Sequence, residues 1–567
     1  MAILQQYSWI IALISIAFCV SSFGNGANDV ANSYATSVAA RTLTMPQVGI
    51  LAMITEFVGA VALGSRVTGT IKNNIIDINH FTAKPATLIL IMGCTEFGSA
   101  TWLIVATKFG FPVSTTQTVV GALIGAGIAA GADVSWSWKS GSVSQVASSW
   151  AIAPLIAAGF SAILFGTIKF GILNRKDPFK WAMRLTPFYY AFTAAVLALF
   201  MVVEVPNGDS LEEFGVGKIL GIVFGTFFGV LGFAYIFFIP YFHRRIVAGD
   251  TRIRSWHIPL GPLLWRDNPP LYWPSKRGTG VKDYSGGAKL TGHGHTATAA
   301  SQNTPVMASK ATRPEGSESP VPDSEKNAVH QGPLEHAVVR DAREKYLGPT
   351  EGKKFYHPMR AFAYVNYIFW RGVSKDCVTF DDEHLHKTHA HAAVYDNNVE
   401  HLWTYAQVAS AMMMSIAHGS NDVANSVGPW VAAYQTYTTG TVSSKGDTPV
   451  WILVIAGFLL GTGFWFFGYH IIRSLGNRIT RVSPTRGYSI ELGAAITVLL
   501  ASQLALPVST TQCLTGATVG VALMNFDAAA VNWKQLGFIF MGWIITLPAA
   551  GLIAGLLTAM ALNTPHF

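Results

Sequence analysis

Charged residues are scarce in this chain. Only 12% of its 567 residues are Asp, Glu, Lys or Arg, whereas a typical soluble domain contains about 25%. Most of these charges lie in the segment 241–400, so the remainder of the chain is nearly free of them. Apolar residues make up 50% of the sequence, and the mean hydropathy is +0.36. This composition excludes an ordinary soluble protein and predicts a chain whose solvent is mostly the lipid bilayer.

Cysteine is also rare, with only Cys19, Cys94, Cys377 and Cys513. Their spacing matches neither a disulfide framework nor a zinc site. The sequence lacks a Walker loop, a nucleophile elbow and a nucleotide fingerprint, so neither an enzyme nor a cofactor is predicted. The net charge of +8 is compatible with nucleic acid. However, no segment combines basic residues with aromatic stacking platforms, so no nucleic-acid partner is expected.

Long apolar runs predict about 12 transmembrane segments, because a helix needs about 20 apolar residues to cross the hydrocarbon core. Seven precede the polar segment, near 8–39, 46–66, 85–106, 111–132, 146–173, 187–205 and 217–240. Five follow it, near 404–435, 449–472, 488–505, 507–526 and 535–562. The predicted fold class is therefore an all-α integral membrane protein. We expect the first and the eighth segment to be broken helices, because both contain polar residues midway.

Three regions follow from this pattern: a first transmembrane block at 1–240, a largely disordered loop at 241–400 and a second block at 401–567. The loop has too little apolar surface to offset its ordering entropy, but its aromatic ends, 256–273 and 356–370, are predicted to lie on the membrane surface. Short loops contain eleven Lys and Arg on one side of the membrane and six on the other. The positive-inside rule then makes the loop cytoplasmic and both termini extracellular.

Two short motifs each occur twice. Asn-Asp-Val-Ala-Asn-Ser occupies 28–33 and 421–426, and Pro-Val-Ser-Thr-Thr-Gln occupies 112–117 and 507–512. The same order at nearly the same separation indicates a duplication. Seven segments separate equivalent points, and an odd number inverts the two halves across the membrane, which places a transporter's site near the midplane. The halves stay inverted if 85–132 forms a re-entrant hairpin, because two crossings are then lost.

The first motif is suited to a cation. Asp29 and Asp422 lie in apolar segments, where a carboxylate is costly unless it has a function. Carboxylate and amide oxygens are hard ligands that suit sodium rather than a soft metal. We expect Gly26 and Gly419 to loosen the helices there and free backbone carbonyls. The alternative is a structural polar network between helices. The predicted cation-binding residues are Asn28, Asp29, Asn32, Gln117, Asn421, Asp422, Asn425 and Gln512.

The second motif is suited to an oxyanion. Proline is tolerated in the first turn of a helix, and the hydroxyls and unpaired N–H groups that follow form an anion site at the positive helix end. Two such ends that meet from opposite sides can surround a tetrahedral oxyanion with donors. The alternative is ordinary helix capping by Ser or Thr. The predicted anion-binding residues are Ser114, Thr115, Thr116, Ser509, Thr510 and Thr511.

Three glutamates, Glu56, Glu96 and Glu491, also lie inside apolar runs. Glu96 and Glu491 match across the duplication, each sixteen residues before its proline, whereas Glu56 has no acidic counterpart. Each is expected to hold a cation, carry a proton or pair with a buried donor. His418, just before the second Asn-Asp pair, is either a titrating group or a hydrogen-bonded structural residue.

The residues 26–33 and 418–425, both proline motifs and Ile490-Glu491-Leu492 resemble the signature of the inorganic phosphate transporter (PiT) family. The segment 70–77 makes the fungal sodium–phosphate symporters the nearest group. This resemblance covers both apolar blocks, and the duplicated motif is highly specific. The central loop matches only in position and character. Asn25 is a departure, since relatives often have an apolar residue there.

The resemblance implies a secondary active symporter that imports phosphate with sodium, by alternating access, as a plasma-membrane homodimer with sodium as its only metal. It assigns Ser114, Thr115, Ser509 and Thr510 to phosphate, and Asp29 and Asp422 with their asparagines to sodium or a joint site. It makes Glu56 and Glu491 transport-essential acids. Two alternatives stay open. One is a proton-coupled symporter in which Glu56, Glu491 or His418 carries the proton. The other is a phosphate sensor that signals through the loop.

Overall fold

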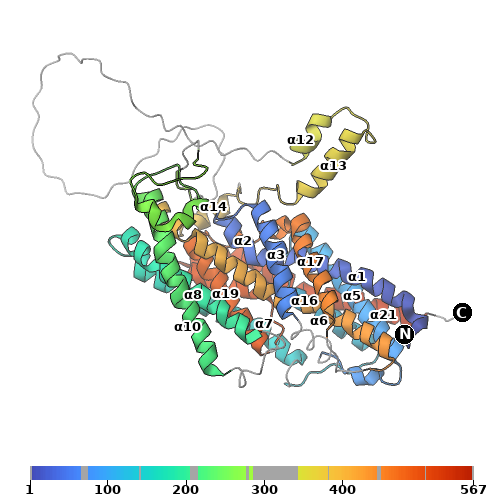
Figure 1. Ribbon diagram of the computed structural model, residues 1–567. Coiled ribbons are helices and arrows are strands. Elements are labelled where there is room, and N and C mark those ends of the chain that lie inside the picture. The colour runs from blue at the N-terminus through green and yellow to red at the C-terminus, as the bar shows by residue number, and fades with distance from the viewer. Residues whose placement is uncertain are drawn as a thin grey trace, which may run out of the picture.

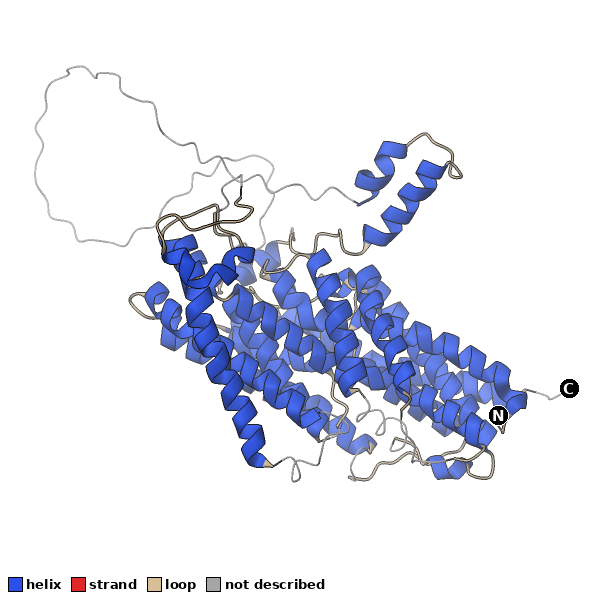
Figure 2. Cartoon of the chain, viewed as in Figure 1, coloured by secondary structure: helices blue, strands red, loops and turns tan. Residues whose placement is uncertain are grey.

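The computed structural model describes residues 3–64, 75–138, 142–204, 215–275, 280–284, 342–380, 382–442, 448–504 and 506–564. Helices that lie alongside one another form the body of the molecule (Figure 1). Within the described residues no strand is present (Figure 2), and the backbone forms only an isolated bridge between Ile76 and Val134. The all-α prediction is confirmed.

Each of the twelve predicted segments coincides with a helix. The first block contains α1 (Ser8–Asn28), α2 (Val30–Ala39), α3 (Met45–Leu63), α5 (Pro85–Phe109), α6 (Thr115–Ala129), α7 (Val143–Ile168), α8 (Pro178–Glu204) and α10 (Val216–Phe233). The second block contains α16 (Thr404–Thr439), α17 (Val450–Phe467), α19 (Pro484–Gln503), α20 (Thr510–Leu523) and α21 (Trp533–Asn563). Eight helical stretches of the described chain are long and apolar enough to cross a membrane.

The helices that follow the proline motifs are short. α6 has 15 residues and α20 has 14, which gives lengths of about 21–22 Å at 1.5 Å per residue. The hydrocarbon core is about 30 Å thick, so neither helix crosses it alone. Val113 and Ser114, just before α6, are fully buried, which agrees with a motif that lies inside the bundle. The exact number of crossings stays a prediction.

The first predicted segment is broken and the eighth is not. Asp29 alone separates α1 from α2. α16 is one continuous helix of 36 residues, so the predicted break in it was wrong. Two polar groups of α16 have partners in neighbouring segments. The Asn421 side chain donates to the Val508 carbonyl, and the Asp422 carbonyl accepts from the Asn25 side chain. These two lateral bonds form while α16 keeps a regular helical backbone.

Gly26 and Gly419 mark places where two helices approach very closely. A Cβ at Gly26 would lie 1.9 Å from the carbonyl oxygen of Leu460 on α17, and one at Gly419 would lie 2.7 Å from that of Glu56 on α3. Both glycines lie within regular helices. Their role is close packing, and the prediction that they loosen the helices was wrong.

We expect Gly26→Ala to lower the thermal stability of the purified protein by several degrees. The added Cβ meets backbone rather than a movable side chain, and overpacking costs about 1–3 kcal/mol even in ordinary cores. The measurement is a melting curve in detergent. Gly221→Ala on α10 is the matched control, because a Cβ there has no atom within 4 Å. Equal melting temperatures for the two variants would contradict this packing.

Equivalent helices of the two blocks have equivalent neighbours. α1 packs against α5 and α17, and α16 packs against their counterparts α19 and α3. α6 packs against α21, and α20 packs against α7. This pairing is what a duplicated chain with the same internal order produces, and it brings the two proline motifs to one place.

The segment 241–400 is partly folded. Its described parts include a 3-10 helical stretch, η6 (Ser255–Trp265), and the helices α12 (Ala342–Leu347), α13 (Pro358–Arg371), α14 (Glu383–Ala390) and α15 (Asn397–Leu402). The predicted disorder of its middle concerns mainly 285–341, which lie outside the described residues. Figure 1 shows the labelled helices α12, α13 and α14 of this segment at one end of the bundle and both chain termini toward the other.

Candidate ion-binding site

The repeated motifs meet inside the bundle. The break between α1 and α2, the middle of α16 and the first turns of α6 and α20 converge there. None of the fourteen predicted cation- and anion-binding residues is more than 4% exposed. The site is therefore closed to both sides in this structure, and an ion reaches it only when helices move.

Asp29 connects the first motif to both proline motifs. Its Oδ1 accepts hydrogen bonds from Thr511 Oγ1 (2.7 Å) and Asn32 Nδ2 (3.1 Å). Its Oδ2 accepts from Thr115, through Oγ1 at 2.7 Å and the backbone N–H at 3.2 Å. Bonds to a carboxylate are stronger than neutral ones, so this side chain holds the first turns of α6 and α20 in place.

Asp422 also accepts hydrogen bonds from a threonine and an asparagine. Its Oδ2 accepts a hydrogen bond from Thr510 Oγ1 at 2.8 Å, the counterpart of the bond from Thr115 to Asp29. Its Oδ1 accepts from Asn421 Nδ2 at 2.6 Å. The same residue types thus hold each aspartate in the two halves.

The two halves also bind each other reciprocally. Asn32 Nδ2 donates to Thr511 Oγ1 at 2.8 Å, and its counterpart Asn425 Nδ2 donates to Thr116 Oγ1 at 3.2 Å. The Thr116 hydroxyl donates in turn to the Val508 carbonyl of the opposite proline motif at 3.2 Å. Thr511 has a single proton to donate, and its shorter bond is the one to Asp29 Oδ1, at 2.7 Å rather than 3.2 Å to the Val113 carbonyl of the opposite motif. Because every bond joins one half to the other, motion between the halves changes the site.

The serines of the proline motifs cap their helices. Ser114 Oγ accepts from the Gln117 N–H at 3.2 Å, and Ser509 Oγ accepts from the Gln512 N–H at 3.3 Å. The capping alternative is thus observed for these two residues. Each hydroxyl still has its own proton, which it can donate to an anion.

Six buried amide oxygens at the site accept no hydrogen bond from a described residue. They belong to Asn25, Asn32, Gln117, Asn421, Asn425 and Gln512. A buried polar atom without a partner is costly and requires an explanation such as a bound ion or water. Five of the six are predicted cation ligands, and Asn25 was noted only as a departure from the family. Asn28 differs, because its Oδ1 accepts from the Val113 N–H at 3.0 Å.

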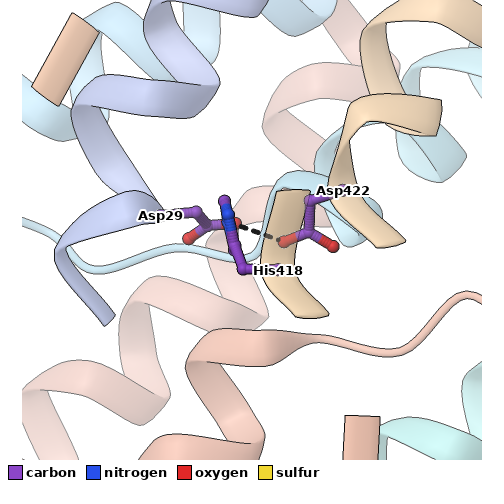
Figure 3. Close-up of side chains that lie close together, drawn as sticks. All are labelled: Asp29, His418 and Asp422. Atoms are coloured by element: carbon purple, nitrogen blue, oxygen red, sulfur yellow. Dashed lines mark ion pairs between the residues drawn. The ribbon is translucent and has the colours of Figure 1, made fainter. Parts of the chain in front are cut away.

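Asp29, His418 and Asp422 form the one group of metal-ligand type found among the described residues, with their ligand atoms within 4.8 Å of one another. Figure 3 shows the His418 ring between the two carboxylates. His418 Nε2 lies 3.1 Å from Asp422 Oδ2, and its Nδ1 lies 2.7 Å from Glu56 Oε2. Ser415 Oγ donates to Glu56 Oε1 at 2.5 Å. Glu56 therefore reaches the site through a histidine that occurs only in the second half.

Glu491 occupies a separate polar cluster. Its Oε1 accepts from Thr36 Oγ1 (2.6 Å) and Ser37 Oγ (2.7 Å), and its Oε2 accepts from Ser410 Oγ (2.6 Å). The sequence reasoning did not select these three hydroxyls, although all lie on the apolar helices that contain the first motif. Glu96 is buried in α5, and Ser21 of α1 is the polar side chain nearest to it. The three glutamates thus do not form one site.

Known proteins resemble this chain over almost its whole length. A model of the phosphate transporter family matches residues 25–554. The phosphate-repressible phosphate permease pho-4 of Neurospora crassa is 39% identical, and the alignment covers 100% of this chain and 99% of that protein. Sodium-dependent phosphate transporter 1-A of Danio rerio is 28% identical, over 94% of this chain and 91% of the relative.

A solved structure described as the sodium-dependent phosphate transporter has the same fold. It superposes with a TM-score of 0.63, at 22% identity, over 98% of this chain and 100% of the other. The family model and the Neurospora relative confirm the resemblance that the duplicated motifs indicated. They also agree with the prediction that the chain is a transporter and not an enzyme. This membrane-embedded chain belongs to the phosphate transporter family.

Proposed function

We propose that this chain imports inorganic phosphate together with sodium across the plasma membrane. The observation that supports it most is the set of six buried amide oxygens without partners beside two carboxylates. Oxygen ligands of this kind suit a hard cation such as sodium. The names of the Danio relative and of the solved structure, both sodium-dependent phosphate transporters, agree with this assignment.

Phosphate is proposed to bind where the two proline motifs meet. The N–H groups of Thr116, Thr510 and Thr511 belong to first turns, whose amides have no acceptor within their own helix. The hydroxyls of Ser114 and Ser509, which accept from Gln117 and Gln512 and keep their own protons, lie at the same helix ends. The positive ends of two helix dipoles face the site. These groups supply donors from two directions, as a tetrahedral anion requires.

Sodium supplies the positive charge that this anion site lacks. No Lys or Arg of the described chain bonds to Asp29 or Asp422, whose partners are hydroxyl, amide, imidazole and backbone N–H groups. Two carboxylates repel phosphate until cations neutralise them. Cations therefore bind first in our scheme, and this order couples the two substrates.

Alternating access then follows from the reciprocal bonds. Each half contributes threonines that bind the other half's asparagine or aspartate. A shift of one half against the other opens the site to one side while it changes these bonds. The inverted topology, the extracellular termini, the cytoplasmic segment 241–400 and the homodimer remain parts of this proposal.

Proton coupling is a second candidate. The continuous contact from Glu56 through His418 to Asp422 favours it, because it joins two carboxylates by an imidazole that can take up and release a proton. A proton held by Glu56, His418 and Asp422 would supply, beside Asp422, the positive charge that one sodium ion supplies in the first proposal. The phosphate-sensor alternative has no comparable observation in its favour.

Radiolabelled phosphate uptake into proteoliposomes separates these candidates. We expect uptake with an inward sodium gradient at equal pH, and no accumulation with an inward proton gradient when potassium replaces sodium. Uptake that follows only the proton gradient would move the coupling to Glu56 and His418. No uptake under either gradient would contradict the transport proposal and favour the sensor.

A further inference from the structure

One helix of the segment 241–400 has an uncovered apolar face. Along α13, the exposed fractions are 57% for Met359, 68% for Phe362, 63% for Val365, 58% for Ile368 and 44% for Phe369. Residues spaced by three or four positions share one side of a helix. Soluble surfaces rarely expose so many large apolar residues together unless they bind something.

The other face of α13 is covered by α12. Arg360 Nη1 donates to the Leu347 carbonyl and to Thr350 Oγ1, both at 3.2 Å, and Ala363 is buried between the two helices. α12 therefore covers the side of α13 that contains Arg360, and the apolar side of α13 stays open. Two helices that pack together in water would instead bury the apolar side of α13 between them.

The C-terminal end of α13 is attached to the spanning helix α17. Trp465 Nε1 donates to the Phe369 carbonyl at 2.7 Å, and the rings of Trp370 and Trp465 are 5.6 Å apart. A Cβ at Gly372 would lie 2.2 Å from the Trp465 carbonyl oxygen. Tryptophans gather where the hydrocarbon core meets the headgroups, so this contact places the end of α13 at that depth.

The spanning helix α17, which contacts the end of α13, has exposed apolar residues of its own. Phe458 and Phe467 of that spanning helix are 59% and 44% exposed, as expected for side chains that contact lipid. Figure 1 shows α13 leaving the bundle next to α17 rather than folding back over it. Exposed apolar residues therefore occur on both helices that meet at this contact.

The net charge of α12, α13 and the residues between them indicates which lipid headgroups this segment attracts. Residues 343–371 contain six Lys and Arg but only two Glu. Lys353 and Lys354, just before α13, are exposed. Basic residues beside an apolar helix face attract anionic headgroups. A second copy of the chain fits this face less well, because a symmetric dimer contact brings the same basic residues together.

We propose that α13 lies in the headgroup layer of the membrane, with its apolar face on the acyl chains, and that it binds anionic phospholipid. α17 also packs beside the ion site, since the backbone of Leu460 is in contact with Gly26 in α1, three residues before Asp29. This inference does not depend on which ion drives transport.

Spin-label accessibility in nanodiscs tests the proposal on the full-length protein. The label is placed at Val365→Cys and, as a control, at Lys353→Cys, both in a Cys19→Ser background, because the other three cysteines are buried. In discs with anionic lipid, we expect the Val365 label to be several-fold less accessible to a water-soluble nickel chelate than the Lys353 label, and readily accessible to oxygen. Equal nickel accessibility at both positions would overturn the proposal.

Two further comparisons identify the partner. Dipolar broadening of the Val365 label, with exclusion of oxygen, would show a second copy on this face and also overturn the proposal. Lys353→Gln with Lys354→Gln is expected to raise the nickel accessibility at Val365 several-fold in anionic discs, and Lys84→Gln is the matched control. The same accessibility in anionic and purely zwitterionic discs would overturn the assignment to anionic phospholipid.

Discussion

Asp29→Asn abolishes sodium-driven phosphate uptake while the protein is still made and inserted. The substitution removes a negative charge and places an amide N–H₂ where one carboxylate oxygen accepts from Thr511 or Thr115. Hydrogen bonds to charged groups contribute about 1.5–3 kcal/mol each. Since 1.4 kcal/mol is about a factor of ten, we expect a loss of at least about 100-fold.

The measurement is initial phosphate uptake in proteoliposomes with an inward sodium gradient, normalised to the amount of protein in the vesicles. Asp77→Asn is the matched control. It makes the same charge change at an exposed residue in the loop between α3 and α5, so uptake should be unchanged. Normal uptake by Asp29→Asn would remove Asp29 from the cation site.

Thr511→Val is expected to reduce uptake by about 10- to 100-fold, although the shape of the side chain changes little. Its hydroxyl donates to Asp29 Oδ1 at 2.7 Å and accepts from Asn32 Nδ2 at 2.8 Å. Valine keeps the size of the side chain but loses both bonds and leaves a buried carboxylate short of one donor, which costs about 1–3 kcal/mol. The bond joins the two halves, so its loss affects the site directly.

Thr515→Val is the control for this second prediction. Thr515 lies one turn further along α20, is equally buried, and donates only to the backbone carbonyl of Thr511 at 2.8 Å. Sodium dependence of uptake is measured for both variants at several sodium concentrations. We expect Thr511→Val to need more sodium for half-maximal uptake and Thr515→Val to behave like the unchanged protein. Indistinguishable curves would mean that the Thr511 hydroxyl takes no part in coupling.

In a soluble enzyme, the site residues are hard to distinguish from other exposed polar residues by sequence alone. In this chain the lipid environment makes the distinction possible. A carboxylate or an Asn-Asp pair inside an apolar run is so costly in lipid that its presence alone marks a candidate. The duplication supplied a second, independent indication. For this reason Asp29, Asp422 and both proline motifs were selected correctly as residues that lie together.

Other features had no sequence signal. Glycine in the first motif fits flexibility and close packing equally well, and only the approach of Leu460 to Gly26 decides between them. The continuity of α16 depends on lateral donors and acceptors from other helices. The hydroxyls around Glu491 come from two distant parts of the chain, near residues 36 and 410.

The sequence by itself determined the all-helical membrane fold, the positions of twelve helical segments and the repeated motifs that meet in one buried cluster, because hydrophobic length and repetition are properties of a single chain. The tertiary structure alone decided which partner each polar group has. Asp29 is bound by threonines from both halves, Glu56 reaches Asp422 through His418, and six amide oxygens have no partner among the described residues. Burial makes these pairings strong, and burial exists only when the helices pack together.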